Sequence, residues 1–136
     1  MAKRALDTNI LINHWLRVSK GYRPREIDAK QAGRWGRELM ELQRAGAILT
    51  PIYIEYVCGQ GSAHEVNLAR TYLKPFEIAD EGHILPKDWE NARKIAERVP
   101  RDGLRRQLGD CLIRAICVRL NLEFITAERR FPHRVP

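Results

Sequence analysis

Apolar positions along the chain fall into short runs and longer helical stripes. The short runs, 4–6, 47–51, 76–80 and 122–126, are strand candidates, although the first is too short to define a strand by itself. Between these runs, apolar residues recur every three or four positions, which is the helical period. Strand-sized runs that alternate with helices predict βα units around a mainly parallel sheet.

Six segments carry the helical pattern. The second is the longest, with Trp35, Leu39 and Leu42 on its apolar face and Gly46 as its expected end. The six predicted helices are a segment that begins after Asp7, then 27–46, about 51–59, 64–74, 85–99 and 109–121. No repeat, low-complexity tract or linker interrupts them, so one α/β layer sandwich is expected, a single domain over residues 1–136 with helices flanking the sheet.

The composition is that of a folded, soluble protein. Hydrophobic residues make up 44% and charged residues 30%, and no apolar run approaches the roughly 20 residues of a membrane span. The N-terminus does not read as a signal peptide, so a cytoplasmic location without membrane contact is expected. Three cysteines with no C-x-x-C pair indicate small core residues in a reducing compartment.

The net charge of +7 favours a polyanionic partner. Two basic loops contribute to this charge, one with Arg23 and Arg25 and one with Arg105 and Arg106. These arginines are candidate contacts for a nucleic-acid backbone. Ordinary solvated loops explain them equally well.

Four acidic residues share one position relative to the predicted strands. Asp7 follows the first run, Glu55 lies about one turn into the helix after the second, Asp110 opens the last helix, and Glu128 follows the last run. In open α/β sheets, ligand sites lie outside the carboxyl ends of the strands. Each acid also has an ordinary explanation, as a helix cap for Asp7, a helix-dipole partner for Glu55 or Asp110, and a solvated residue for Glu128.

Convergence of these acids would require a counter-charge. Two carboxylates about 4 Å apart repel by roughly 4 kcal/mol at an effective dielectric of 20. Several together would raise their own pKa values unless a cation neutralised them. Oxygen ligands favour Mg²⁺ or Mn²⁺ over zinc, and such an ion lowers the pKa of an attacking water and stabilises charge on a phosphodiester.

Four motifs resemble those of PIN-domain nucleases, most closely the VapC-type toxins of toxin–antitoxin pairs. They are LDTNIL at 6–11, the Glu inside TPIYIEYV, GDCLIRAI at 109–116 and FITAERRF at 124–131, and they occur in the family's order. The resemblance spans nearly the whole chain. It implies a PIN-like three-layer sandwich and a Mg²⁺- or Mn²⁺-dependent endoribonuclease that is inhibited by a small cognate antitoxin and is often a homodimer.

The resemblance also implies roles for individual residues. Asp7, Glu55 and Asp110 match the family's three principal acids and metal ligands, Thr126 matches the threonine that orders the acid cluster, and Asn9 matches the polar residue of the first motif.

Two positions depart from the family pattern. Glu128 stands where the family usually has Asp, so its longer side chain is expected to act through a water. Arg114, one turn after Asp110, is explained either by a helical Asp–Arg pair or by a phosphate contact.

Three other functions remain as alternatives. A catalytically weak PIN-like protein that binds RNA or serves as a scaffold would keep the acid cluster without turnover, as the unusual Glu128 and Arg130 permit. A nuclease acting on DNA or flaps would use related chemistry. A phosphoacceptor receiver domain also gathers acids at strand ends, but it needs a late lysine, and no lysine follows the run at 122–126.

Overall fold

The computed structural model describes residues 3–102 and 108–127. Strands and helices alternate along the chain, as the apolar pattern predicts. The elements are β1 (Lys3–Leu6), α1 (Thr8–Val18), the short 3-10 helix η1 (Pro24–Glu26), α2 (Ala29–Gln43), β2 (Ala47–Ile48), α3 (Thr50–Cys58), α4 (Ala63–Leu73), β3 (Glu77–Ile78), α5 (Pro86–Asp102), α6 (Leu108–Arg119) and β4 (Leu122–Ile125).

All strand pairs in the described residues are parallel. The sheet has the order β3-β2-β1-β4, so the first and last strands of the chain lie side by side. Their register runs from Lys3 opposite Leu122 to Leu6 opposite Ile125, and Ala5 also lies opposite Ala47 of β2. The segments that follow β1 and β4 therefore leave the sheet at the same edge.

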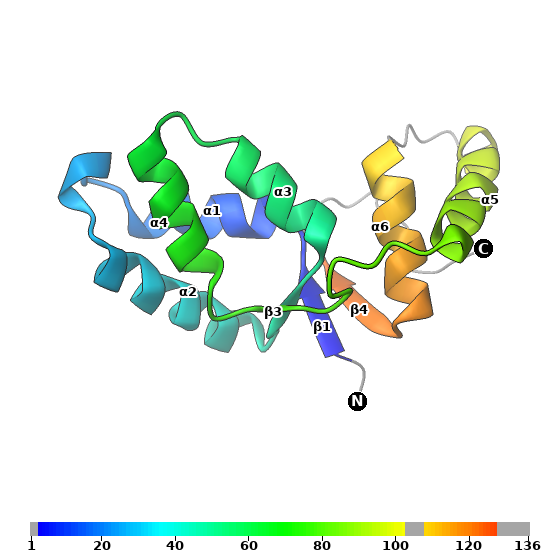
Figure 1. The fold of residues 1–136 in the computed structure, drawn as a ribbon, viewed down its shortest axis with the longest axis horizontal. Helices are drawn as coiled ribbons and strands as arrows, with labels where there is room; N and C mark the ends of the chain where they lie inside the picture. The colour runs from blue at the N-terminus through cyan, green and yellow to red at the C-terminus, as the bar shows by residue number, and fades with distance from the viewer. Residues whose placement is uncertain (1–2, 103–107, 128–136) are drawn as a thin grey trace.

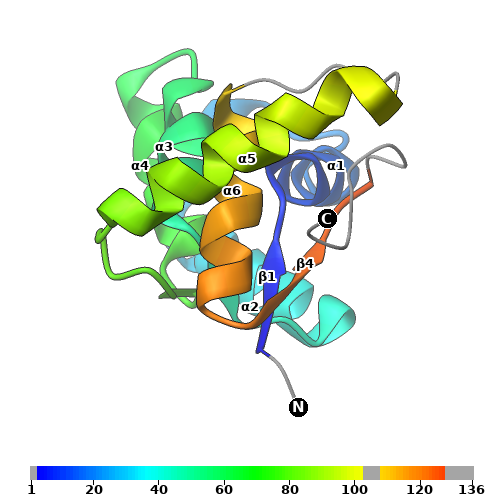
Figure 2. The ribbon, with the colours of Figure 1, turned by 90° about the vertical axis from the view of Figure 1, so that its right-hand side faces the viewer.

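Helices cover both faces of the sheet. Figure 1 shows α1, α2, α3 and α4 on one side and α5 with α6 on the other, and Figure 2 shows α5 crossing over α6. This arrangement confirms the predicted α/β fold with a parallel central sheet flanked by helices, consistent with a PIN-like architecture. None of the helices in the described part of the chain is both long enough and apolar enough to cross a bilayer.

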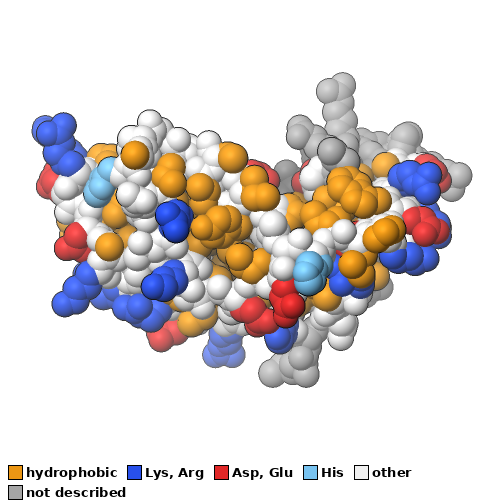
Figure 3. All heavy atoms as spheres, viewed as in Figure 1, with side chains coloured by type: hydrophobic (Ala, Val, Ile, Leu, Met, Phe, Trp, Pro, Cys, Tyr) orange, Lys and Arg blue, Asp and Glu red, His pale blue; other side chains and the backbone are white. Residues whose placement is uncertain are grey.

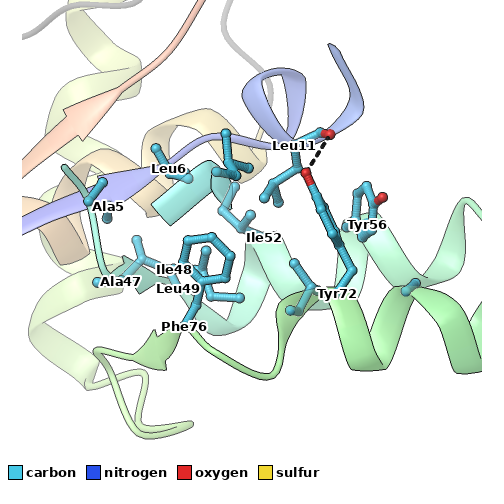
Figure 4. Packing of buried hydrophobic residues seen from close by; sticks show 14 of the residues in the cluster. Ala5, Leu6, Leu11, Ala47, Ile48, Leu49, Ile52, Tyr56, Tyr72 and Phe76 are labelled. Atoms are coloured by element: carbon cyan, nitrogen blue, oxygen red, sulfur yellow. Dashed lines mark hydrogen bonds between the residues drawn. The ribbon is translucent and has the colours of Figure 1, made fainter. Parts of the chain in front are cut away.

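The main core surrounds the sheet, and α1 to α4 on one face and α6 on the other, through Leu112, Ile113, Ile116 and Cys117, contribute to it. Figure 4 shows Leu6, Ile48, Leu49 and Ile52 packed together, and all four are fully buried. Tyr72 of α4 extends into this core, with its hydroxyl 3.5 Å from the Leu11 carbonyl oxygen. The core thus holds α1 and α3, the helices that follow β1 and β2, in fixed positions on the sheet.

A smaller cluster lies between α5 and α6. Ala92 and Ile95 of α5 pack against Cys111 and Ala115 of α6. At the opposite end of these helices, the buried carboxylate of Asp88 accepts a 2.7 Å hydrogen bond from Nε of Arg119. Together these contacts fix α6, the helix that begins near Asp110.

Some local expectations are wrong. Helix α2 ends at Gln43, and Arg44 rather than Gly46 caps it, in the left-handed conformation with φ of 50°. Leu42 is 61% exposed and does not belong to the apolar face. Cys58 is exposed, whereas Cys111 and Cys117 are buried as predicted.

Candidate active site

Asp7 lies where the first strand meets the first helix. Its backbone N–H donates to the Ile125 carbonyl oxygen at 2.9 Å, which continues the pairing of β1 with β4 by one residue. Its side chain then caps α1, with Oδ1 accepting a 2.7 Å hydrogen bond from the N–H of Thr8. The capping role considered for Asp7 is confirmed, and it leaves the second carboxylate oxygen for other partners.

That second oxygen is held from the last strand. The hydroxyl of Thr126, directly after β4, donates to Oδ2 of Asp7 at 2.6 Å. Asn9 donates from Nδ2 to the same hydroxyl oxygen at 3.1 Å, and its Oδ1 accepts from the N–H of Ala127 at 3.1 Å. Thr126, supported by Asn9, thus fixes the orientation of the Asp7 carboxylate.

Glu55 extends from α3 toward the same edge of the sheet. Partial burial raises its pKa, the Asp7 charge raises it further, an interaction with Thr8 lowers it in part, and the Asp110 charge adds a smaller rise. The buried hydroxyl of Thr8 has no hydrogen-bond partner of ordinary geometry, so its interaction with Glu55 is a weak one. Glu55 is therefore within electrostatic reach of two other carboxylates from distant parts of the chain.

Asp110 lies in the first turn of α6 and is half-buried. Its charge reaches Glu55, so the end of β1, the middle of α3 and the start of α6 place one carboxylate each at a common edge. In the described residues, however, no group of three Asp, Glu, His or Cys side chains has the arrangement needed to hold a metal ion. Asp7, Glu55 and Asp110 thus lie near one another, but their carboxylates do not converge closely enough to hold one metal ion together.

Arg114 is too deeply buried to serve as the phosphate contact proposed for it. It is 5% exposed, burial lowers its pKa, and its Nε has no hydrogen-bond partner. Among the ion pairs of the described residues there is none between Arg114 and Asp110. The structure therefore offers neither the helical pair nor a guanidinium surface open to a phosphate.

The described basic loop lies far from the acids. Arg23 and Arg25 are exposed at η1, beyond the end of α1. The 11 residues of α1 separate this loop from Asp7 by on the order of 16 Å. Arg105, Arg106, Glu128 and Arg130 lie outside the described residues.

Asp80 supports the site, although it is not among the four acids predicted from the sequence. It follows β3 and is 3% exposed. Its carboxylate accepts from the N–H and the hydroxyl of Thr50, at 3.1 and 2.7 Å, and thereby caps α3 from a neighbouring strand. The rule that found Asp7, an acid directly after a strand, also applies to Asp80 in FEIAD. A carboxylate so enclosed is a poor phosphoacceptor, which further disfavours a receiver domain.

Comparison with known proteins gives one match. The PIN domain family matches residues 5–135, which is nearly the whole chain. No curated protein and no solved structure matches. PIN domains are in general nucleases that use divalent metal ions, and the edge of the sheet that carries Asp7, Glu55 and Asp110 is compatible with such chemistry. The chain belongs to the PIN-domain family.

Proposed function

We propose that the protein is a metal-dependent endoribonuclease and the toxin component of a type II toxin–antitoxin system. The observation that carries this proposal is that the charges of Asp7 and Asp110 both raise the pKa of Glu55 at the carboxyl edge of a parallel sheet. Two carboxylates from distant segments thus disfavour the charged form of a third, and such an arrangement is characteristic of functional sites.

The donor set fits a hard divalent cation. Asp7, Glu55 and Asp110 offer only carboxylate oxygens, which suit Mg²⁺ or Mn²⁺ better than zinc. The raised pKa of Glu55 marks a point where added positive charge would be stabilising. When bound, the ion supplies a water of lowered pKa and stabilises negative charge on the phosphate.

The protein's own residues orient this donor set. Thr126 and the N–H of Thr8 each hold one oxygen of Asp7, so the carboxylate cannot rotate freely. Asp80 fixes the first turn of α3 and thereby the helix from which Glu55 extends. Glu128 is proposed to orient the attacking water.

RNA is the proposed substrate, held by a basic protein with a net charge of +7. The choice of RNA over DNA rests on the resemblance to VapC-type toxins. Cleavage assays on a structured RNA and on single-stranded DNA of matched length separate the two. Faster cleavage of the DNA would favour a DNA or flap nuclease.

The central experiment replaces Asp7 by Asn, which keeps a capping side chain but removes the charge. We expect Asp7→Asn to lower the rate of RNA cleavage in Mg²⁺ by at least about 100-fold, the scale of losing one charge-stabilising group. The matched control is Asp28→Asn, because Asp28 caps α2 through a 2.8 Å hydrogen bond from the N–H of Gln31. Wild-type cleavage by Asp7→Asn would contradict the proposal.

A small antitoxin and a homodimer belong to the same proposal. The genomic test is a short reading frame next to this gene that encodes a DNA-binding protein. The biochemical test is co-purification, followed by removal of the partner or addition of excess Mn²⁺. Restored cleavage would support inhibition at the metal site, and unchanged activity would contradict it. Light scattering of the purified protein measures its oligomeric state.

A catalytically weak RNA-binding or scaffolding protein is the second candidate. The absence of a three-residue metal-holding group among the described residues favours it. RNA binding without any Mg²⁺-dependent cleavage by the purified full chain would support this candidate over the endoribonuclease.

A further inference from the structure

We infer that the surface formed by α2 and α4 is a nucleic-acid contact in addition to the acidic edge of the sheet, and that it binds RNA backbone phosphates at a distance from that edge. The inference deepens the proposed function, because it assigns a binding surface for the same substrate. It involves none of the arginines selected from the sequence. Figure 3 shows Lys and Arg side chains gathered over the part of the molecule where α2 and α4 lie.

The two helices approach each other closely because two glycines face α4. A Cβ atom at Gly36 would overlap the carbonyl oxygen of Tyr72, and one at Gly33 would lie 3.6 Å from a methyl group of Thr71. The same Gly33 position lies 3.7 Å from Nη1 of Arg37, so the guanidinium extends back along the surface of α2. The glycines thus bring the outer faces of α2 and α4 together into one continuous surface.

This surface contains two hollows that meet along one ridge. The first, of about 470 Å³, is lined by Lys30 and Arg37 of α2 and by Thr71 and Lys74 at the end of α4. The second, of about 540 Å³, shares Thr71 and Lys74 and adds Arg70. Each hollow therefore has at least two cationic side chains on its wall.

Within residues 3–102 and 108–127, no acidic side chain neutralises the charges of this surface. None of the described Asp or Glu residues lines either hollow. Among the ion pairs of the described residues there is none that involves Lys30, Arg37, Arg70 or Lys74. Concave walls of one charge sign concentrate the field in the hollow between them, which favours an anionic ligand.

Another hollow of the same size provides the contrast. It lies at the amino end of the strands, has a volume of about 540 Å³, and includes Lys3 and Arg4 in its lining. There, however, Lys3 pairs with Glu77 at 3.1 Å and Arg4 with Glu123 at 3.5 Å. Basic residues in a hollow are thus not always free, and those on α2 and α4 differ in having no acidic partner in the described part of the chain.

The second hollow leads toward the helix of the candidate site. Its lining includes Tyr53, which belongs to α3 and precedes Glu55 by two residues. Tyr53 is half-buried and presents an aromatic ring beside the cations. Basic grooves that contain an aromatic ring are typical of single-stranded nucleic-acid binding, because the cations follow the backbone and a base stacks on the ring. An RNA strand held here would approach α3 from the side of α4.

The test measures binding separately from cleavage. The probe is a fluorescein-labelled single-stranded RNA of about 20 nucleotides, bound to the full chain in EDTA and followed by fluorescence anisotropy over a series of salt concentrations. The variant is Arg70→Gln/Lys74→Gln. Losing two phosphate contacts is expected to reduce the slope of log Kd against log salt by about 1.4, at about 0.7 per contact on a single strand.

The matched control is Lys87→Gln/Lys94→Gln, which also removes two positive charges. Both lysines lie on α5, where they pair with Glu90. The inference would be overturned if Arg70→Gln/Lys74→Gln lost no more RNA affinity, and no more of the slope of log Kd against log salt, than this control. The inference would also be overturned if Arg70→Gln/Lys74→Gln bound RNA as the wild type does but no longer bound vesicles with anionic phospholipids. That result would assign the surface to a membrane. Thermal unfolding of each variant verifies that the fold is intact.

The outcomes separate this inference from the proposed function. If the wild type binds the RNA through Arg70 and Lys74 but does not cleave RNA in Mg²⁺, the endoribonuclease proposal fails and the surface remains. If the wild type cleaves RNA and the variant retains the full salt slope, the endoribonuclease proposal stands and the surface assignment fails.

Discussion

The hydroxyl of Thr126 donates a 2.6 Å hydrogen bond to Oδ2 of Asp7, joining two residues that are 119 positions apart in the chain. The bond exists because β1 and β4 are parallel neighbours that end at the same edge of the sheet. It leaves the Asp7 carboxylate with one oxygen bound to its own helix and the other bound to the last strand. The orientation of this candidate ligand is thus determined by strand pairing.

Thr126→Val tests this bond, because valine keeps the shape of threonine without its hydroxyl. A hydrogen bond to a charged group contributes about 1.5–3 kcal/mol, so the RNA cleavage rate is expected to fall by about 10- to 100-fold. Thr126→Ser keeps the hydroxyl and should retain most of the rate. Equal rates for the valine and serine variants would show that the bond does not matter for cleavage.

Glu55→Gln tests the electrostatics of the acidic edge. Because burial and the Asp7 and Asp110 charges raise the pKa of Glu55, the folded protein binds this proton more tightly than the unfolded chain does. The free energy of unfolding should therefore fall as pH rises from the ordinary glutamate range through the raised pKa. In metal-free buffer at neutral pH, Glu55→Gln is expected to stabilise the protein, by at most about 1 kcal/mol because the side chain is exposed to solvent.

The comparison uses thermal unfolding at several pH values. The stabilisation by Glu55→Gln should disappear below the ordinary glutamate range, where the wild-type carboxyl is also protonated. Glu97→Gln on α5 is the control, since Glu97 is exposed and belongs to none of the ion pairs of the described residues. A Glu55→Gln protein less stable than wild type at neutral pH would contradict the repulsion of Glu55 by Asp7 and Asp110.

Asp80→Ala tests the cap of α3. The substitution removes the acceptor for the N–H and hydroxyl of Thr50 and leaves both without their partner. Loss of a cap typically costs about 0.5–2 kcal/mol, so the free energy of unfolding in urea should fall by that amount. Asp80→Asn keeps an acceptor oxygen and should lose less stability. If Asp80 also positions Glu55, cleavage by Asp80→Ala will fall under conditions where the variant remains folded.

Gly36→Ala tests the close contact of α2 with α4. A Cβ at this position would overlap the backbone of Tyr72, which has no flexible side chain to move aside. Overpacking of this kind costs about 1–3 kcal/mol, so the midpoint of thermal unfolding should fall by several degrees. Gly46→Ala is the control, because its nearest non-neighbouring atom is the Met40 sulfur at 3.8 Å. A Gly36→Ala protein as stable as Gly46→Ala would mean that the helices are packed less tightly than described.

The sequence predicted the order of strands and helices well, because that order depends on local periodicity. The parallel sheet, the helices that flank it and the position of Asp7 at the end of the first strand follow from apolar runs and the residues that end them, whereas Asn9 and Thr126 were identified only through the family resemblance. The end of α2 was placed wrongly because Arg44, an ordinary residue, adopts the left-handed conformation in which glycine was expected. Local signals cannot identify such a residue when tertiary contacts determine the turn.

The grouping of basic residues into a surface, unlike the order of strands and helices, depends on tertiary structure. The sequence indicated Arg23 and Arg25 as nucleic-acid contacts because they form a basic run. In the structure they lie at η1, which follows the C-terminus of α1, whereas Asp7 caps the N-terminus of that helix. The sequence did not indicate Arg70 and Lys74 as nucleic-acid contacts, because each is a single charge on an ordinary amphipathic helix.

The sequence by itself determined the type and order of the elements and which acid follows which strand, because these depend on residues a few positions apart. Only the tertiary structure decided that Thr126 binds Asp7, that Asp80 caps α3 and that the cations of α2 and α4 share one surface. The physical reason is that electrostatic and hydrogen-bond energies depend on distance in space. That distance is fixed by strand pairing and by the close helix contact at Gly36.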